Sequence, residues 1–285
     1  MDLGSIRNYE TAAKDLYLSS LVNPENYIAK IPGPLPISSA TAALRDNFSI
    51  TPNSTGKFLL VIDPFNLNIK LYQGDDLTGQ AGEGNATEIP LVISNTIVDQ
   101  FRVVSSGVIL RYFGNFNQMS GIIVGAVTSD PSGQVDWRKF QNIEDLTNKY
   151  ISKCVDGIKL IYTPMDNRAT EFYPISTYTQ NNHPLKNQYL FVIYGDQFPN
   201  NTCIRVDYFK NIEYTTTPAY REYIMQSKSI PVTYELPNIH QQASIAPSGS
   251  GYGFGSYNNN NIPYELKLLS SGDSRGLSIS PKFLM

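Results

Sequence analysis

The chain has 285 residues, with 22 Lys and Arg against 25 Asp and Glu, which gives a formal net charge of -3. Hydrophobic residues make up 41% and aromatic residues 12%, so the chain can build a sizeable core and wholesale disorder is excluded. Charged residues make up only 16%, against roughly 25% in an ordinary globular domain, which suggests that much of the surface meets other protein.

Three further classes of protein are excluded by the residue pattern. No apolar stretch approaches the roughly 20 residues of a membrane-spanning helix, so no membrane span is expected. The N-terminus lacks the basic start and apolar run of a signal peptide. The two cysteines, Cys154 and Cys203, are too few for a disulfide framework, and we expect free thiols in a reducing compartment.

Residues 1–45 are predicted to form an N-terminal arm that contains a short helix. Apolar residues recur at helical spacing over residues 6–17, with Ser5 as a candidate N-cap, and Asn23 with Pro24 ends this pattern. Residues 31–36 carry four closely spaced helix breakers, which require an extended chain. Four basic and four acidic residues leave the arm without net charge.

Residues 46–240 carry strand patterns in series. The last pattern alternates, with Ile204, Val206 and Tyr208 on one face and Arg205 and Asp207 on the other. The expected strands lie at residues 57–63, 68–72, 101–113, 119–127, 157–162, 171–175, 188–195 and 202–214. One helical pattern, over residues 135–151, interrupts them. About eight strands with few helices and long connections favour an all-β fold, an eight-stranded antiparallel jelly-roll sandwich with short helices in its loops.

Residues 241–285 are predicted to be a flexible C-terminal tail rich in Gly, Ser and Asn. Its alternating glycines at residues 249–255 resemble a phosphate-binding loop only superficially. They lack both a preceding strand and the following Lys-Ser or Lys-Thr pair. We interpret the segment as a linker.

Residues that could support catalysis or bind a metal ion are few. The two histidines, His183 in a predicted turn and His240 near the tail, are interpreted as surface or loop residues. Clustered Cys and His, which a zinc site needs, are absent. Asp75 and Asp76 lie in a predicted loop and are the candidates for a calcium site. No other cofactor is expected.

The densest basic clusters are small. Arg138 with Lys139, and Lys149 with Lys153, are the residues predicted to face nucleic acid. No segment of the chain is a basic arm. Any binding of nucleic acid by this chain is therefore expected to be weak.

Three segments together carry a resemblance to a known family. They are Phe-Arg-Val-Val-Ser-Ser-Gly-Val-Ile-Leu-Arg-Tyr-Phe at 101–113 with Ser-Gly-Ile-Ile-Val-Gly-Ala at 120–126, Asp-Gly-Ile-Lys-Leu-Ile-Tyr-Thr-Pro-Met-Asp at 156–166 with Glu171 and Phe172, and Thr-Cys-Ile-Arg-Val-Asp-Tyr-Phe-Lys-Asn-Ile-Glu-Tyr-Thr at 202–215. In order and spacing they resemble the single jelly-roll coat proteins of small icosahedral viruses, of nodavirus-like, tombusvirus-like and bacilladnavirus-like types. The resemblance covers about residues 57–220.

The resemblance implies a structural capsid protein and no enzyme. Many copies would self-assemble inside the host cell into the icosahedral shell of a virion. The shell would enclose RNA or single-stranded DNA that this chain binds weakly; no host receptor is implied. Two family features are not matched: a long Arg/Lys-rich N-terminal segment, and a self-cleavage site near the C-terminus, since the only Asn-Ala pair is Asn85-Ala86.

Two other functions remain open from the residues alone. The first is a carbohydrate-binding or host-attachment jelly roll, in which loop tyrosines and Trp137 would stack on sugars. The second is a glycosidase, for which paired carboxylates are required. Glu171 and Asp207 lie in predicted strands, and we interpret both as solvent-facing side chains.

Overall fold

The computed structural model describes most of the chain up to residue 228. The described residues are 3–33, 37–73, 86–91, 93–114, 120–128, 130, 132, 143, 146, 148–164, 166–180, 182–199, 202–228 and 241, with side chains from residue 11 onward except that of residue 86. All of them belong to one compact unit, Met1–Gly253.

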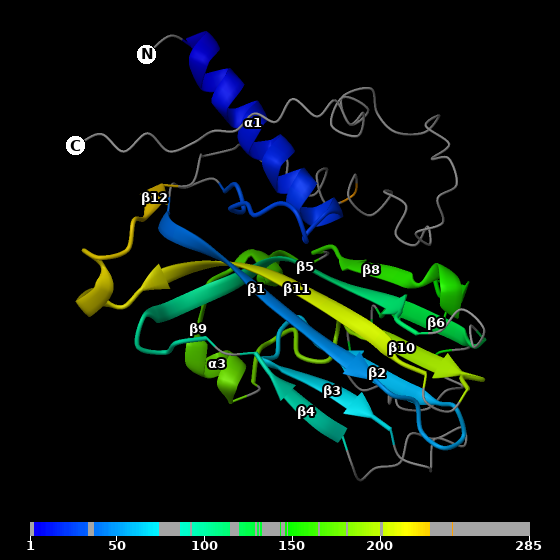
Figure 1. Cartoon of the computed structure of the whole chain (residues 1–285). Helices are drawn as coiled ribbons and strands as arrows, with labels where there is room; N and C mark the ends of the chain where they lie inside the picture. The colour runs from blue at the N-terminus through cyan, green and yellow to red at the C-terminus, as the bar shows by residue number, and fades with distance from the viewer. Residues whose placement is uncertain are drawn as a thin grey trace. The chain divides into compact units, whose positions relative to one another are not determined.

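The strands in these ranges form two antiparallel sheets (Figure 1). The first sheet has the order β12 (Ser227–Lys228), β1 (Ser38–Ile50), β11 (Ile204–Thr216), β5 (Val98–Tyr112) and β8 (Ile158–Tyr162), and β9 (Tyr173–Pro174) also pairs with β5. The second has the order β4 (Ala86–Pro90), β3 (Asn68–Tyr72), β2 (Phe58–Ile62), β10 (Phe191–Asp196), β6 (Ile122–Val127) and β7 (Tyr150–Lys153). The described helices are α1 (Leu3–Val22) and α3 (Ile175–Thr179), with short 3-10 turns η2 (Cys154–Asp156), η3 (Asn167–Thr170) and η4 (Pro218–Tyr220).

The chain passes between the two sheets in jelly-roll order. Strands β1, β11, β5 and β8 are neighbours in the first sheet, and β2, β10, β6 and β7 in the second. The connections β1–β2, β5–β6, β7–β8 and β10–β11 each change sheet, so these eight strands form the paired Greek keys of a jelly roll. The prediction of an all-β, eight-stranded antiparallel jelly roll is confirmed. The second sheet is extended by β3 and β4.

Alternation along β11 builds the core between the sheets. Ile204, Val206 and Tyr208 are fully buried, as predicted. Arg205 is exposed and Asp207 is half-buried, so the expected register is confirmed. The buried face packs with apolar residues of both sheets into one cluster. Burial of each such side chain contributes about 1.5–3 kcal/mol to folding.

A bulge in β5 lets this strand bury both of its faces. Asn211 of β11 pairs with Ser105 and Ile212 pairs with Val103, which leaves Val104 without a partner in the ladder. Val103 belongs to the core between the sheets, whereas Val104 packs with residues of α1. The extra residue therefore supplies apolar surface to the opposite side of the sheet, where α1 lies.

The buried face of β11 also carries a residue of charged type, Lys210. Its ammonium nitrogen donates a hydrogen bond to the carbonyl oxygen of Asn66 at 2.6 Å. Burial lowers the pKa of Lys210 to about 7, and the nearby Asp63 carboxylate opposes this shift. Because the amine finds its acceptor in a loop after β2, it connects the two sheets through the core.

Three expected elements differ from those observed. Residues 38–45, assigned to the arm by the sequence, belong to β1, which crosses the predicted boundary at residue 45. The helical pattern over 135–151 ends in β7, so Tyr150 and Ile151 are in a strand. The strand expected at 171–175 is reduced to β9 and runs directly into α3. In β1 the extended form follows from pairing with β11, because its Ser- and Ala-rich sequence has little strand preference.

His183 is in a loop, as one of the two expected positions, surface or loop, allowed, and it is buried. Its side chain is only 4% exposed. The imidazole stacks on Phe65 with ring centroids 4.5 Å apart, and Tyr173 and Tyr178 contact its other sides. Its Nδ1 accepts a hydrogen bond from the Leu185 amide at 3.1 Å. Burial lowers the pKa of His183 to about 4. His240 lies outside the described residues.

Acid is expected to destabilise the fold through His183. The pKa of this group is about 4 in the folded chain, against an ordinary value of 6.5, so between these pH values the unfolded chain binds more protons. Stability from the neutral ring is therefore complete above pH 6.5 and is lost as the pH falls through 4, with a slope of up to about 1.4 kcal/mol per pH unit. Urea unfolding of the wild type and of His183→Phe between pH 4 and 6.5 measures this slope of the unfolding free energy against pH. Identical slopes in the two proteins would contradict the assignment.

Candidate functional site

The outer face of the first sheet is covered by the arm segment, residues 17–33, which comprises the end of α1 and the chain that follows it. Helix α1 lies over β5 and β8 (Figure 1). The apolar cluster at this junction consists of Tyr17, Leu21, Ala29, Ile31 and Val104, all buried. The arm segment is therefore packed against the body by apolar side chains.

A buried ion pair fixes the arm segment to the sheet. Glu213 of β11 and Arg102 of β5 are in contact, with 2.8 Å between Arg102 Nη2 and Glu213 Oε2. Glu213 also accepts hydrogen bonds from the Ile31 amide at 3.0 Å and from the Ser39 hydroxyl at 2.5 Å. Arg102 donates in turn to the carbonyl oxygens of Ile31 at 2.9 Å and Thr170 at 2.6 Å. Both charged groups thus satisfy their hydrogen bonds through the arm and the sheet.

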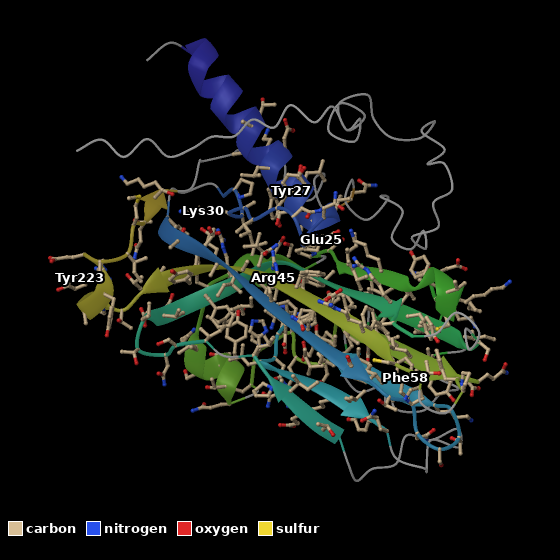
Figure 2. All side chains as sticks on the ribbon, in the orientation of Figure 1. Glu25, Tyr27, Lys30, Arg45, Phe58 and Tyr223 are labelled. Atoms are coloured by element: carbon tan, nitrogen blue, oxygen red, sulfur yellow. The ribbon has the colours of Figure 1, made fainter. Side chains whose placement is uncertain are left out.

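Lys30 adds a second cation at the same place. Its ammonium nitrogen donates to the carbonyl oxygens of Ser39, at 2.5 Å, and Ser227. Burial lowers the pKa of Lys30, and the Glu213 carboxylate opposes this shift. We call Lys30, Arg102 and Glu213 the arm clamp. Figure 2 labels Lys30 at the junction between α1 and the first sheet.

Hydrogen bonds and an ion pair hold the turn after α1 against the first sheet. The Asn211 amide donates to the carbonyl oxygens of Pro24 and Tyr27, both at 2.9 Å. Lys159 of β8 contacts Glu25 at 2.6 Å, with both side chains largely buried. Figure 2 shows Glu25 and Tyr27 between the helix and the strands. The turn is thus attached to two different strands of the sheet.

Four of the connections that change sheet, β1–β2, β5–β6, β7–β8 and β10–β11, have described parts that meet at one end of the sandwich. The Phe198 amide donates to the Gly56 carbonyl at 3.1 Å, and the Cys154 amide donates to the Gly121 carbonyl at 3.0 Å. Gly157 closes the β7–β8 connection with a φ of 64°, and a Cβ there would lie 2.4 Å from the Leu110 carbonyl oxygen. The glycine of the Asp-Gly pair in the resembling segment is therefore required by the backbone.

This end presents large apolar side chains to solvent. Phe113 is 68% exposed, Ile151 64%, Val155 50% and Ile122 37%. We call these four residues the loop-end surface. Ile122 and Ile151 lie on adjacent antiparallel strands, β6 and β7. These two isoleucines are diagonal neighbours in the ladder, and contiguous exposed apolar side chains are typical of contact surfaces.

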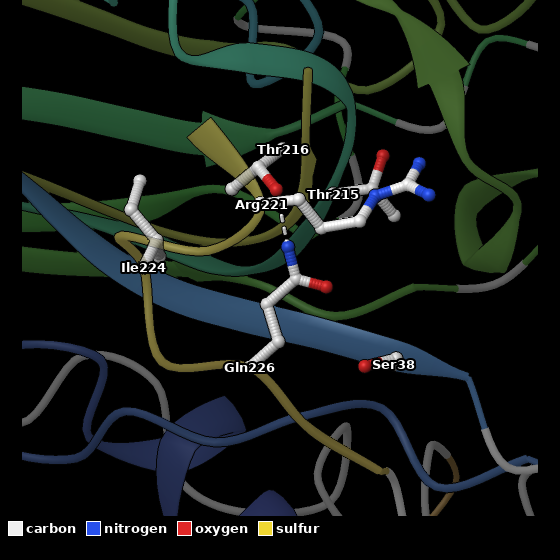
Figure 3. A pocket seen from close by; sticks show the side chains of 6 residues that line it. All are labelled: Ser38, Thr215, Thr216, Arg221, Ile224 and Gln226. Atoms are coloured by element: carbon white, nitrogen blue, oxygen red, sulfur yellow. Dashed lines mark hydrogen bonds between the residues drawn. The ribbon is translucent and has the colours of Figure 1, made fainter. Parts of the chain in front are cut away.

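After β11 the chain turns through η4 and returns as β12, which lies at one edge of the first sheet. A hollow of 440 Å³ lies between this return and the ends of β1 and β11. Figure 3 shows its lining side chains, which are Ser38, Thr215, Thr216, Arg221, Ile224 and Gln226. Gln226 donates a hydrogen bond to the Thr216 hydroxyl across the hollow.

The predicted nucleic-acid-facing residues are described only in part. Lys153 is exposed at the end of β7, and Lys149 is half-buried in the residue before this strand. The structure therefore brings these two side chains to one sheet edge. Arg138 and Lys139 lie outside the described residues.

The predicted calcium residues, Asp75 and Asp76, also lie outside the described residues and stay a prediction. Among the residues that are described, no group of three or more His, Cys, Asp or Glu side chains is placed to hold a metal ion. Cys154 and Cys203 are both free thiols, and burial raises the pKa of Cys154 to about 11. No helix in the described ranges is long and apolar enough to span a membrane.

Sequence reasoning missed the arm clamp. Its only local signal is a charge at Arg102 and at Glu213 inside strands that otherwise read as apolar or half-buried. The partners are far apart in the chain, with 111 positions between Arg102 and Glu213. No short pattern links them.

Comparison by sequence finds no matching family model and no curated relative. Comparison by structure finds coat proteins of infectious bursal disease virus. The subunit of its derived T=1 particles matches with a TM-score of 0.60 and 9% identity over 79% of this chain and 89% of that one. The subunit of its T13 particle matches with a TM-score of 0.59 and 9% identity over 85% and 98%. A Gx-strain structure matches with a TM-score of 0.61 and 10% identity over 80% and 93%. At these identities the comparison establishes the shared fold.

Proposed function

We propose that the chain is a structural capsid protein whose copies self-assemble into an icosahedral shell around a viral genome, inside the host cell. The observation that carries this proposal is the similarity to the T13 particle subunit, which extends over 98% of that subunit's chain. Nearly the whole of that subunit thus has a counterpart here. The proposed role is structural and involves no catalysis.

The proposed mechanism is association through the sheet edges and the loop-end surface. A stable protein interface buries roughly 800 Å² on each partner, with an apolar centre. Phe113 and Ile151 are well exposed and could form part of such a centre. The low charge of the chain, 16% of residues, favours close contact between identical copies.

We further propose that three segments of the chain have different roles. Residues 1–45 are proposed to act as the arm, whose last residues, 38–45, already belong to β1 of the jelly roll, residues 46–240 as the jelly-roll shell domain and residues 241–285 as a flexible tail. The packing of the arm segment onto the first sheet is compatible with an arm that serves the shell domain. Calcium at Asp75 and Asp76 is part of the same proposal.

The packaged genome is proposed to be RNA or single-stranded DNA, bound weakly by each subunit. The chain carries a net charge of -3, and strong packaging would need many Lys or Arg contacts with phosphates. Arg138, Lys139, Lys149 and Lys153 are the residues proposed to face it.

Size-exclusion chromatography with light scattering, followed by electron microscopy of the purified full chain, tests the proposal. We expect megadalton particles of uniform diameter from a 31.8 kDa subunit. A monomer that binds glycans would instead support the attachment function. Phe113→Ser with Ile151→Ser should reduce the particle yield at least tenfold, because loss of central interface side chains costs roughly 2 kcal/mol or more.

A matched control is Ile28→Ser, which makes the same change at a 40% exposed isoleucine of the arm segment. Circular dichroism should be unchanged in both variants. Equal losses of particles in the two variants would contradict a specific contact through the loop-end surface.

A further inference from the structure

Residues 221–226 present an alternating pattern of exposure at the edge of the first sheet. Tyr223 is 82% and Met225 94% exposed, whereas Ile224 and Gln226 are half-buried and line the hollow. Figure 2 labels Tyr223 at the outer margin of the ribbon, in the return that leads to β12. In this segment Ile224 and Gln226 are used by their own chain, whereas Tyr223 and Met225 project into solvent.

The projecting side chains are of types that favour protein contacts. Tyr and Met are both enriched in protein interfaces, and Met adapts its shape to the surface that it meets. The Tyr223 ring is held at an angle to the Tyr220 ring, with centroids 6.4 Å apart. This contact restrains the projecting ring before any partner binds, which lowers the entropy cost of association.

The charges on this segment are complementary to those on the same segment of a second copy. Arg221 and Glu222 are adjacent and both exposed. A two-fold axis that passes between these two residues would place Arg221 of one copy opposite Glu222 of the other, and the reverse. Opposite charges related in this way suit an isologous contact between two copies.

We propose that residues 221–226 form a two-fold contact with a second copy of this chain, in which the Tyr223 and Met225 side chains of each copy enter the hollow of the other. The hollow of 440 Å³ is lined in part by Ile224 and Gln226, which alternate with the projecting residues along the same short segment. This inference rests on the proposed function, because a shell is built from contacts between identical chains. It goes further by specifying one contact, its symmetry and its residues.

Charge reversal tests the symmetry. Arg221→Glu makes this surface wholly acidic and Glu222→Arg makes it wholly basic, so each variant alone should associate roughly tenfold or more weakly than the wild type. An equimolar mixture of the two variants should recover the wild-type dimer, because both contacts then pair opposite charges. Sedimentation velocity over a range of concentrations measures all three samples. A mixture no tighter than the separate variants overturns the two-fold contact.

Truncation tests the projecting side chains. Tyr223→Ala with Met225→Ser should weaken dimer formation roughly 30-fold or more, with unchanged circular dichroism, because neither side chain belongs to the core. Wild-type association of this variant overturns the inference even where particles form normally, and the proposed function then stands. If dimers form that depend on these residues, but no particles form, the inference is supported and the shell proposal fails. A wild type that stays monomeric at every concentration overturns both.

Discussion

Val206→Asp is expected to abolish soluble folded protein. Val206 is fully buried between the sheets, near the start of β11, where it pairs with Leu110 of β5. The change removes an apolar side chain worth about 1.5–3 kcal/mol and introduces a carboxylate without a partner. Such a buried charge costs several kcal/mol more. The sum approaches the roughly 5–15 kcal/mol that stabilises a typical domain.

Asp207→Ser is the matched control, one position along the same strand. Asp207 is half-buried and pairs with Arg205 at 3.0 Å and Arg111 at 3.9 Å, both of them largely exposed. Exposed pairs of this kind contribute about 0–1 kcal/mol, so soluble yield and urea midpoint should stay close to those of the wild type. Equal tolerance of both substitutions would show that the register of β11 is wrong.

Glu213→Gln is expected to lower the free energy of unfolding by about 3–5 kcal/mol. The amide keeps the shape of the side chain but removes the charge that balances Arg102, whose side chain is only 6% exposed. It also replaces one acceptor oxygen by a donor, so the amide cannot accept from both Ile31 and Ser39. Hydrogen exchange should therefore become faster in residues 23–33, because the arm segment loses its anchor.

Arg168→Gln provides the comparison for that change. Arg168 forms an equally close pair with Asp166, at 2.5 Å, but its side chain is 47% exposed. Its loss should change the unfolding free energy by less than about 1 kcal/mol. Equal destabilisation by Glu213→Gln and Arg168→Gln would show that burial of the arm clamp does not matter.

The strands that the sequence predicted are those whose own residues favour them. Residues 58–62 are uninterrupted apolar residues, and residues 204–208 alternate, so β2 and most of β11 were expected from local pattern alone. Strand β1 was missed because its small and polar residues acquire an extended form only by pairing with β11. Strand β7 was missed because a chance helical spacing runs into Tyr150 and Ile151.

The candidate surfaces were less predictable than the fold. The arm clamp joins three strands and the arm, and no local pattern records those distances. His183 was expected in a surface or loop position because it stands in a turn-forming sequence; it is in a loop, but its burial could not be predicted, because aromatic rings contributed by distant segments enclose it. The exposure of Tyr223 and Met225 depends on where the chain turns after β11, which the residues alone do not indicate.

The arm clamp also has a consequence for the order of events during synthesis. The Ile31 amide binds Glu213, which lies 182 residues later in the chain. At roughly 5–20 residues per second a ribosome needs about 9–36 s to make that interval. For this time the arm segment lacks its anchor at Glu213, although β5 and β8, over which α1 lies, are made earlier. Since the arm clamp requires Glu213, it closes only after synthesis has passed β11.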